Sequence, residues 1–229
     1  MPLSYAEMER HLMDELRLYH HPIAVTFLAT DAEVAEFKRT TPHVVPVKSL
    51  TFCQWEIAAR MQGKTVLGTK DKLFCTNAQC SFGWHEIDEG EIKSQLKYCV
   101  DAAQAERFLR SKPHLPKDSI RALAVGPLGQ AVLPPSVVHF YCDSMQAYHL
   151  AVDYMAATDT HPIRPLLMMS SSACGSSAYS FLEQAFNFCP PCSGSYNAGK
   201  TERGEVNVTI PGTPSWRSEE RRVGKECRS

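Results

Sequence analysis

Cysteine is the residue type in this sequence with the most chemistry to offer, because nine cysteines occur among 229 residues. Thiolates bind Zn²⁺ and the irons of iron–sulfur clusters, and they also act as nucleophiles and redox pairs. Cys189 and Cys192 form a Cys-Pro-Pro-Cys motif, which could chelate a metal or close a redox disulfide. The motif follows a predicted helix instead of opening one, so its position favours a metal ligand over a thioredoxin-type pair.

A closed zinc or iron–sulfur site needs about four ligands, so Cys-x-x-Cys alone supplies half of one. Cys75 and Cys80 offer a second pair, and Cys53 offers a further ligand. The spacings match no ferredoxin pattern, so a cluster would have to be assembled from separate segments. The predicted metal ligands are first Cys53, Cys75 and Cys192, and then Cys80, Cys174 and Cys189. Plain burial of the thiols is the alternative, and it is the reading that we favour for Cys99.

Several cysteines are predicted close to helix starts. Cys53, Cys142 and Cys174 each lie near the beginning of a predicted helix, and the last two directly follow a predicted strand. Helix N-termini present unpaired N–H groups and the positive end of the helix dipole, and both favour a thiolate. These positions are therefore candidates for reactive thiols as well as for ligands.

The serine run at residues 170–177 is a candidate small-ligand site, because small side chains and helix N–H groups can cradle an anion. The predicted ligand-binding residues are Ser172, Gly175, Ser176 and Gly194. A tight turn that needs small residues for packing is the alternative. The sequence contains no phosphate-binding loop, dinucleotide-binding motif, nucleophile elbow or HExxH motif, and it identifies no catalytic residue.

The hydrophobic periodicity of the chain alternates between strand and helix patterns. Predicted helices cover residues 4–19, 31–38, 51–62, 90–111, 144–157 and 174–188. Predicted strands cover residues 23–28, 65–69, 121–129, 136–142, 165–173 and 205–212. Residues 73–84 are a cysteine-bearing loop or short helix, and residues 189–204 are a loop. We therefore expect an α/β (or α+β) fold, with a mixed, partly parallel sheet covered by helices.

The predicted caps of these helices are short polar residues. Ser4 with Glu7 forms a capping-box pattern, Asp31 caps the second helix, and Asp143 or Ser144 caps the helix at 144–157. Ser49 or Thr51 caps the helix at 51–62.

Composition narrows the classes of protein. Hydrophobic residues make up 44 %, which is typical of a folded chain, and the formal net charge of −1 gives no overall attraction to nucleic acid or anionic lipid. No signal peptide or membrane-spanning run is present, so we expect a cytoplasmic protein with no membrane or nucleic-acid partner. Residues 217–229, which include Cys227, resemble a translated sequencing adapter, and we predict that they are a non-native tail. We expect residues 1–216 to form a single domain.

Four stretches of the chain resemble the Domain of Unknown Function 169 family of bacterial and archaeal proteins, for which no reaction is assigned. They are SLTFCQWEIAARMQGKTV, LFCTNAQCSFGW, SSSACGSSAYSFLEQ and PCSGSYNAGKTERGEVNVTIPG. The resemblance implies that the cysteines are important to these proteins, but it does not identify a substrate. One departure is that Ser195 and Tyr196 follow Cys192-Ser193-Gly194, where the family pattern has an acid and an arginine.

Three hypotheses for function remain open at this point. The first is a protein that binds zinc or an iron–sulfur cluster through cysteines, with a redox or small-molecule role. The second is a metal-free, cysteine-dependent enzyme that acts on a small ligand near Cys53 and Cys174. The third is a non-catalytic module that binds a small molecule or a partner, with structural cysteines. The sequence does not decide whether the protein is an enzyme, nor does it give the oligomeric state.

Overall fold

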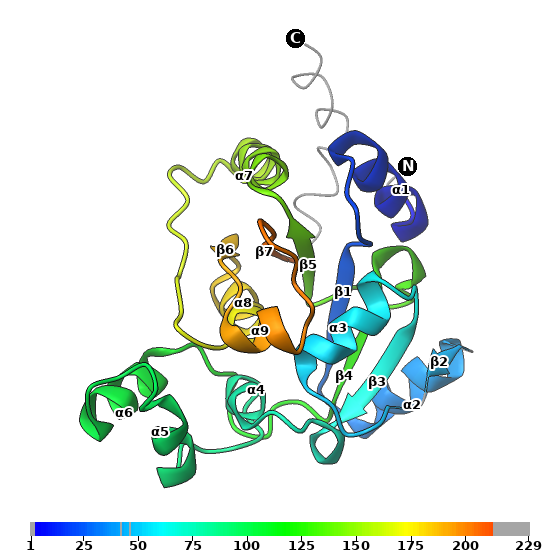
Figure 1. Ribbon diagram of the computed structural model, residues 1–229. Coiled ribbons are helices and arrows are strands. Elements are labelled where there is room, and N and C mark those ends of the chain that lie inside the picture. The colour runs from blue at the N-terminus through cyan, green and yellow to red at the C-terminus, as the bar shows by residue number, and fades with distance from the viewer. Residues whose placement is uncertain (1–2, 42, 46, 213–229) are drawn as a thin grey trace.

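The computed structural model describes residues 3–41, 43–45 and 47–212, and the predicted non-native tail lies outside these residues. Strands within the described residues form a mixed seven-stranded sheet in the order β2-β3-β4-β1-β5-β7-β6, with helices packed on both faces (Figure 1). The bounds of the strands are β1 (Ile23–Leu28), β2 (Val44–Val45), β3 (Thr65–Thr69), β4 (Ala122–Pro127), β5 (Val137–Cys142), β6 (Asn187–Cys189) and β7 (Val206–Pro211).

The mixed sheet confirms the expected α/β class. Its parallel part is short, because only β2 and β3 pair in parallel and every other neighbouring pair is antiparallel. The helices of the described residues are α1 (Tyr5–Leu16), α2 (Asp31–Thr40), α3 (Phe52–Arg60), α4 (Thr76–Ser81), α5 (Glu89–Gln95), α6 (Ala102–Ser111), α7 (Ser144–Thr158), α8 (Ser172–Glu183) and α9 (Ser193–Asn197). None of them is long and apolar enough to cross a bilayer.

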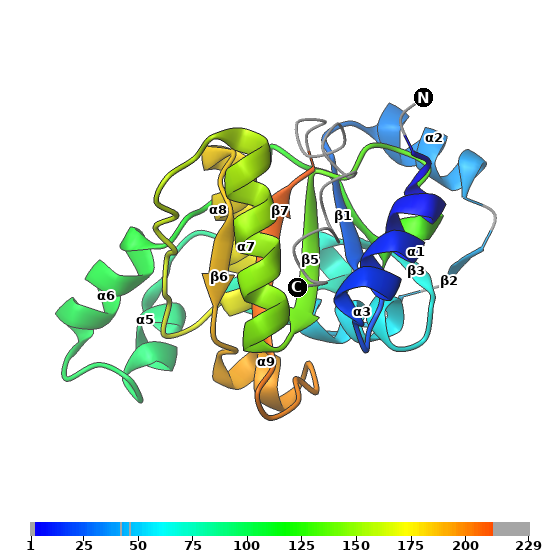
Figure 2. The ribbon, with the colours of Figure 1, turned by 90° about the horizontal axis from the view of Figure 1, so that it is seen from above.

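Alternation along the central strands separates two hydrophobic layers. Successive side chains of a strand point to opposite faces, so Ile23 and Val25 of β1 pack with α3, α4 and α8, whereas Ala24 packs with α1 and α7. We call these two sides the thiol face and the α1–α7 face. Figure 2 shows α1 and α7 in front of the sheet. The same alternation on β5 assigns Tyr141 to the thiol face and Cys142 to the α1–α7 face.

Capping residues set the helix starts, and most were predictable. The Ser4 capping box begins α1 and the Asp143 side chain caps α7, as expected. Thr51, one of the two predicted candidates, caps α3 through a box with Gln54. The predicted cap of α2 was wrong, because the Thr30 hydroxyl accepts from the third residue of the helix and Asp31 is already helical.

Two predicted elements are wrong. The single helix over 90–111 is two helices, because Asp101 has extended backbone and caps α6, which requires the chain to leave the helical conformation just before it. The predicted strand over 165–173 is absent from the sheet, because β7 occupies the place beside β5. The Leu166 N–H instead donates to Asn187 Oδ1 at 2.7 Å.

The predicted helix over 174–188 is also too long. Helix α8 ends at Glu183, and β6 takes residues 187–189, where it pairs with β7. The predicted loop over 189–204 contains the short helix α9.

Candidate functional site

Four cysteines from four segments form one group on the thiol face. Each thiolate of the group would raise the pKa of the others, and this holds for all six pairs that can be drawn. The interaction indicates that the four thiols lie within electrostatic range of one another, although they come from residues up to 139 positions apart in the chain. We call this group the cysteine quartet; its members are Cys53, Cys75, Cys174 and Cys192.

Every member of the quartet lies at the start of a helix. Cys53 is the second residue of α3, Cys174 is the third residue of α8, and Cys75 and Cys192 occupy the N-cap positions of α4 and α9. Unpaired backbone N–H groups are concentrated at such positions, and they stabilise negative charge on a nearby sulfur. The four helices that carry the thiols, α3, α4, α8 and α9, lie in the same region of the fold (Figure 1).

Cys192 has the most polar surroundings of the four. Burial acts to raise its pKa, but hydrogen bonding to the Ser172 hydroxyl and to the backbone N–H groups of Ser195, Ser172 and Gly194 outweighs burial and lowers the pKa. The Cys192 N–H also donates to Ser172 Oγ at 2.9 Å, which ties the start of α9 to the start of α8. The serine run thus supports the quartet directly.

The other three thiols are harder to ionise. Burial raises the pKa of Cys53 well above its ordinary value, and it raises the pKa of Cys174 to about 12. Burial also raises the pKa of Cys75, although the N–H groups of Ala78 and Asn77 act in the opposite direction. Without a cation these thiols are therefore protonated at neutral pH, and metal binding would have to release their protons.

A glycine allows the segment after α9 to approach α3. A Cβ at Gly199 would lie 2.9 Å from the Cβ of Cys53 and 2.5 Å from the carbonyl oxygen of Ser195. Neither distance is tolerable for a side chain. Glycine at this position therefore lets Cys53 and the Cys192 segment meet.

The quartet is not arranged around a single ion. Within residues 3–41, 43–45 and 47–212, no group of three or more histidine, cysteine, aspartate or glutamate side chains is positioned to hold one metal ion. A tetrahedral zinc site with Zn–S bonds of about 2.3 Å brings its sulfurs within roughly 3.8 Å of one another. The four thiols interact electrostatically, but they do not have the compact geometry of a zinc site.

The structure places the remaining predicted cysteine ligands outside the quartet. Cys80 on α4 is near Cys75 but also near Glu91 and Lys112, and Cys189 on β6 is near Cys192. Both are buried.

Two further cysteines are more distant. Cys142 lies in the apolar layer of the α1–α7 face, so its predicted position at a helix start does not bring it to the site. Cys174, a member of the quartet, was predicted to follow a strand directly. It follows an irregular segment instead. Cys99 is buried as expected, in the turn between α5 and α6 rather than within a helix.

Beneath the quartet is a fully buried chain of polar side chains. His139 Nδ1 lies 2.8 Å from Glu56 Oε1, and His139 Nε2 lies 2.9 Å from Ser177 Oγ. The Tyr141 hydroxyl donates to Glu56 Oε2 at 2.6 Å. Glu56 is one helical turn after Cys53, and Ser177 is one turn after Cys174. The chain therefore links the two quartet helices α3 and α8 through β5, and we call it the buried relay.

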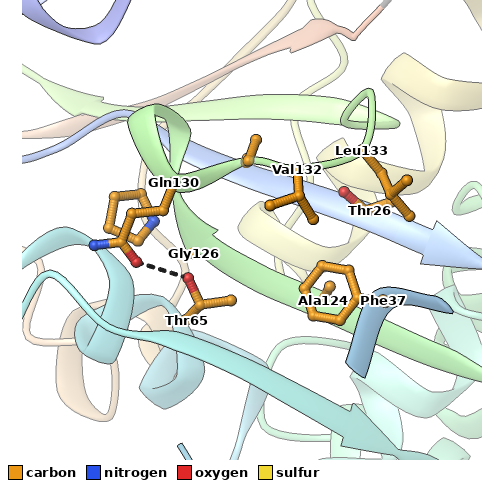
Figure 3. Close-up of a pocket in the computed structure, with 11 residues that line it drawn as sticks. Thr26, Phe37, Thr65, Ala124, Gly126, Gln130, Val132 and Leu133 are labelled. Carbon is orange, nitrogen blue, oxygen red and sulfur yellow. Dashed lines mark hydrogen bonds between the residues drawn. The ribbon is translucent and has the colours of Figure 1, made fainter. Parts of the chain in front are cut away.

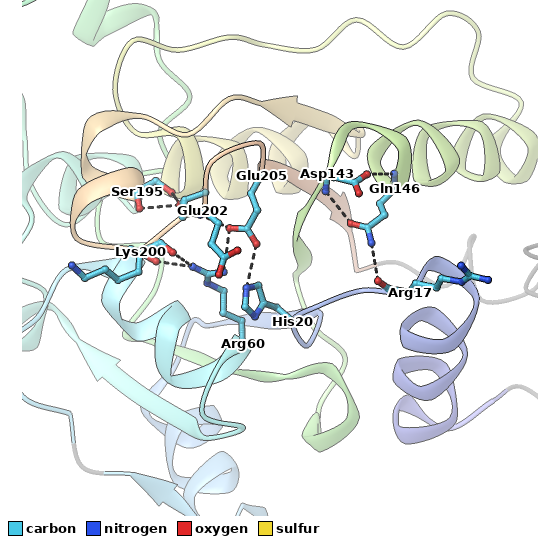
Figure 4. Close-up of polar contacts among 11 residues, drawn as sticks. Arg17, His20, Arg60, Asp143, Gln146, Ser195, Lys200, Glu202 and Glu205 are labelled. Carbon is cyan, nitrogen blue, oxygen red and sulfur yellow. Dashed lines mark hydrogen bonds and ion pairs between the residues drawn. The ribbon is translucent and has the colours of Figure 1, made fainter.

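Arg60 anchors the C-terminal end of α3. Its guanidinium donates to the carbonyl oxygens of Gly199 and Lys200 at 2.8 and 2.7 Å, and it lies 3.5 Å from Glu205 Oε2 (Figure 4). The second oxygen of Glu205 is 3.2 Å from His20 Nε2. The guanidinium also stacks 4.2 Å above the Tyr141 ring. Arg60 thus joins α3 to the segment that follows Cys192.

The four predicted ligand-binding residues have separate roles. Ser172 and the Gly194 N–H face Cys192. The Ser176 hydroxyl accepts from Asn187 Nδ2 at 2.7 Å and so connects α8 to β6. Gly175 packs against Met168, where a Cβ would lie 2.7 Å from the thioether sulfur. Two of these residues therefore contact the quartet, and two pack α8 against its neighbours.

A small pocket lies apart from the quartet. It has a volume of about 10 Å³, roughly enough for one water molecule, and lies between the sheet and the segment at 126–133 (Figure 3). Thr65 donates to Gln130 across its rim at 2.9 Å, and its other lining residues include Phe37 and Leu133. No cysteine lines it, so it offers no access to the thiols.

Comparison with known proteins identifies the family. The family model for DUF169, described as Uncharacterised ArCR, matches residues 11–214. The chain belongs to the DUF169 family. The matched region contains the whole quartet and the buried relay. No curated protein and no solved structure gives a match to this DUF169 protein.

Sequence reasoning missed several residues around the site. Glu56, His139 and Ser177 are far apart in the chain, and only the i, i+3 spacing of Cys53–Glu56 and of Cys174–Ser177 hinted that they share helix faces with the thiols. Nothing in the sequence indicated that Lys112 is buried near the site, because a lysine at a helix end is ordinarily exposed. In the structure it is 4 % exposed.

Proposed function

We propose that this DUF169 protein binds an iron–sulfur cluster through Cys53, Cys75, Cys174 and Cys192, and that it has a redox role. The observation that carries the proposal is the electrostatic coupling among all four thiols, each supplied by a different helix start. Four thiolates are the usual protein ligands of an iron–sulfur cluster. The proposal selects these four from the six cysteines that the sequence suggested.

The donor geometry favours a cluster over a single zinc ion. A single ion needs its ligands drawn together around one centre, and no described group of side chains has that arrangement. In a cluster the thiolates bind different irons, so their sulfurs stay farther apart. Four interacting thiols that are not drawn together around one centre therefore fit a cluster better than a single zinc ion.

The surroundings of the sulfurs support the same assignment. A bound cluster with four thiolates is anionic, and hydrogen bonds to its sulfurs stabilise it and tune its potential. This chain supplies backbone N–H groups at Cys192 and Cys75, and the Ser172 hydroxyl at Cys192. The buried relay holds the middle of α3 and Arg60 holds its C-terminal end, so the quartet is built on braced elements.

Partial exposure of the site supports the proposed redox role. Cys53, Cys75 and Cys192 are partly exposed, whereas Cys174 is buried. A cluster held by these residues would supply a one-electron store near the surface, where a soluble donor or acceptor could approach. Cluster thiolates must remain reduced, so the proposal also assigns the protein to a reducing, cytoplasmic setting.

A second candidate function is metal-free thiol chemistry at Cys192. Cys192 is the member of the quartet whose pKa is lowered, and Cys189 lies near enough to interact with it. A thiolate with a neighbouring thiol is the arrangement that redox-active cysteines use. This candidate differs from the first in requiring no iron.

The first experiment is analysis of the full chain purified and reconstituted without oxygen. We expect iron and acid-labile sulfide in equal amounts, about four of each per chain for a cubane cluster, together with a broad absorbance near 400 nm that fades on addition of dithionite. Zinc without colour would overturn the cluster assignment. A colourless protein without metal, in which Cys192 alone reacts rapidly with iodoacetamide, would replace the first candidate with the second.

A further inference from the structure

Lys112 is a buried cation beside the quartet. It follows α6 directly, and its ammonium donates to Asn77 Oδ1 on α4 and to Ser171 Oγ at the start of α8, each at 3.0 Å. It lies within electrostatic range of Cys174 and Cys75, two members of the quartet. A lysine that is 4 % exposed without a direct carboxylate partner is costly, so its retention calls for an explanation.

Glu91 of α5 is the opposite charge in the same cluster. It is also 4 % exposed, and its Oε2 atom has no hydrogen-bond partner among the described residues. Glu91 acts on Cys75, Cys80 and Lys112, but it forms no ion pair with Lys112 within 4 Å. The two charges therefore face the thiols separately and do not cancel within one salt bridge.

Both charges come from one part of the chain. Helices α5 and α6 pack on each other and lie to one side of the sheet, next to α4 (Figure 1). Lys112 reaches from the end of α6 to the starts of α4 and α8, which carry Cys75 and Cys174. The α5–α6 pair thus contributes no thiol, but it places a buried ammonium group and a buried carboxyl group beside the site.

We propose that Lys112 is a positioning residue that raises the reduction potential of the cluster site, and that Glu91 opposes it. This inference rests on the proposed function. Each electron taken from a reductant adds one negative charge to the site, so a nearby cation favours the reduced form and a nearby carboxylate disfavours it. The hydrogen bonds from Lys112 to Asn77 and Ser171 also hold α4 and α8 at a fixed distance from each other.

The test is a spectroelectrochemical titration of the reconstituted full chain with dithionite as electron donor. We expect Lys112→Met to lower the midpoint potential and Glu91→Gln to raise it. Lys112→Arg keeps the charge, so it should stay close to the wild-type value. Lys117→Met is the matched control, because Lys117 is an exposed lysine that pairs with Glu86 and has the same formal charge.

Opposite shifts in K112M and E91Q would support an electrostatic role, because a purely structural defect has no reason to reverse sign. Equal potentials in wild type, K112M and E91Q would overturn the inference while leaving the cluster assignment intact. Equal lowering in K112M and K112R would also overturn it. If K112M fails to assemble a cluster, E91Q carries the test alone, and an unchanged or lowered potential in E91Q contradicts the proposal. Wild-type protein without iron and sulfide is a separate outcome, which contradicts the proposed function itself.

Discussion

Tyr141 and Cys142 are neighbours on β5, and they show how differently the two faces of the sheet are built. Tyr141 points to the thiol face, where its hydroxyl binds the buried carboxylate of Glu56 and its ring lies under Arg60. Cys142 points to the α1–α7 face, where it packs among apolar side chains such as Leu150 and Phe140. One face therefore buries polar and charged groups around its cysteines, whereas the other treats its cysteine as a small hydrophobic residue.

Buried polar groups are an expensive way to fill a core, because each must keep its partner. The thiol face therefore depends on specific contacts, and the α1–α7 face depends on volume and apolar area. Substitutions on the two faces should differ in kind. On the thiol face they should reduce both stability and metal content, and on the α1–α7 face they should reduce stability alone.

The largest effect is expected from His139→Ala on the thiol face. It would leave Glu56 buried without its imidazole partner, which costs about 3–5 kcal/mol of unfolding free energy. It would also loosen α3 and α8 relative to each other, so iron content should fall. Urea unfolding and iron analysis on the same preparation measure both effects. A stable variant with full iron would show that the buried relay does not brace the quartet.

Leu150→Ala makes the corresponding change on the α1–α7 face. Leu150 on α7 is 7 % exposed, and its truncation should cost about 2–5 kcal/mol by loss of apolar contact and formation of a cavity. Iron per folded chain should match wild type, because α7 carries no member of the quartet. If this variant lost iron as readily as H139A, the proposed division between the two faces would be wrong.

Arg60→Met should have a somewhat smaller effect on stability, about 2–3 kcal/mol, because hydrogen bonds from a charged group to two carbonyls are lost. Methionine retains the apolar stem over Tyr141. We expect slower cluster assembly, since the segment after Cys192 would no longer be tied to α3. Arg110→Met is the control, because Arg110 forms an exposed pair with Glu106. Arg60→Met and Arg110→Met with equal stability and equal assembly rates would contradict the role given to Arg60.

The smallest effect concerns pH. Burial, with a smaller contribution from Lys112, lowers the pKa of His114 to about 4, so the unfolded chain binds a proton here before the folded chain does. Folding stability should therefore decline as pH falls from about 6.5 toward 4. His114→Gln removes this contribution, and the difference in unfolding free energy between pH 7 and pH 5 should be smaller than in wild type. An equal or larger difference would be inconsistent with a partly buried, neutral His114.

The sequence predicted those parts of the molecule that depend on local signals. Short β-branched, aromatic and apolar runs predicted β1, β3, β4 and β5, and alternation of side chains predicted β7. Short polar residues before apolar runs predicted most helix starts. The failures came where tertiary contacts decide: the break at Asp101 between α5 and α6, and the segment at 165–171, which β7 excludes from the sheet.

The sequence likewise indicated some residues of the candidate site and not others. Cysteine type and helix-start position pointed toward Cys53 and Cys174, and the motif at 189–192 pointed toward Cys192. The predicted order of ligands placed Cys75 before Cys80, which lies five residues later, but no local signal showed which side of α4 faces α8. The buried relay and Lys112 were equally inaccessible, since their partners are brought together only by the sheet.

The most direct test of the account compares the iron content of Cys174→Ala and Cys142→Ala after identical anaerobic reconstitution of the full chain. Both residues are buried cysteines near the start of a helix, but they lie on opposite faces of the sheet. The account predicts that C174A loses most of its iron and its absorbance near 400 nm, whereas C142A retains both. Equal iron in the two variants, whether full or absent, would contradict the assignment of the quartet as the cluster site.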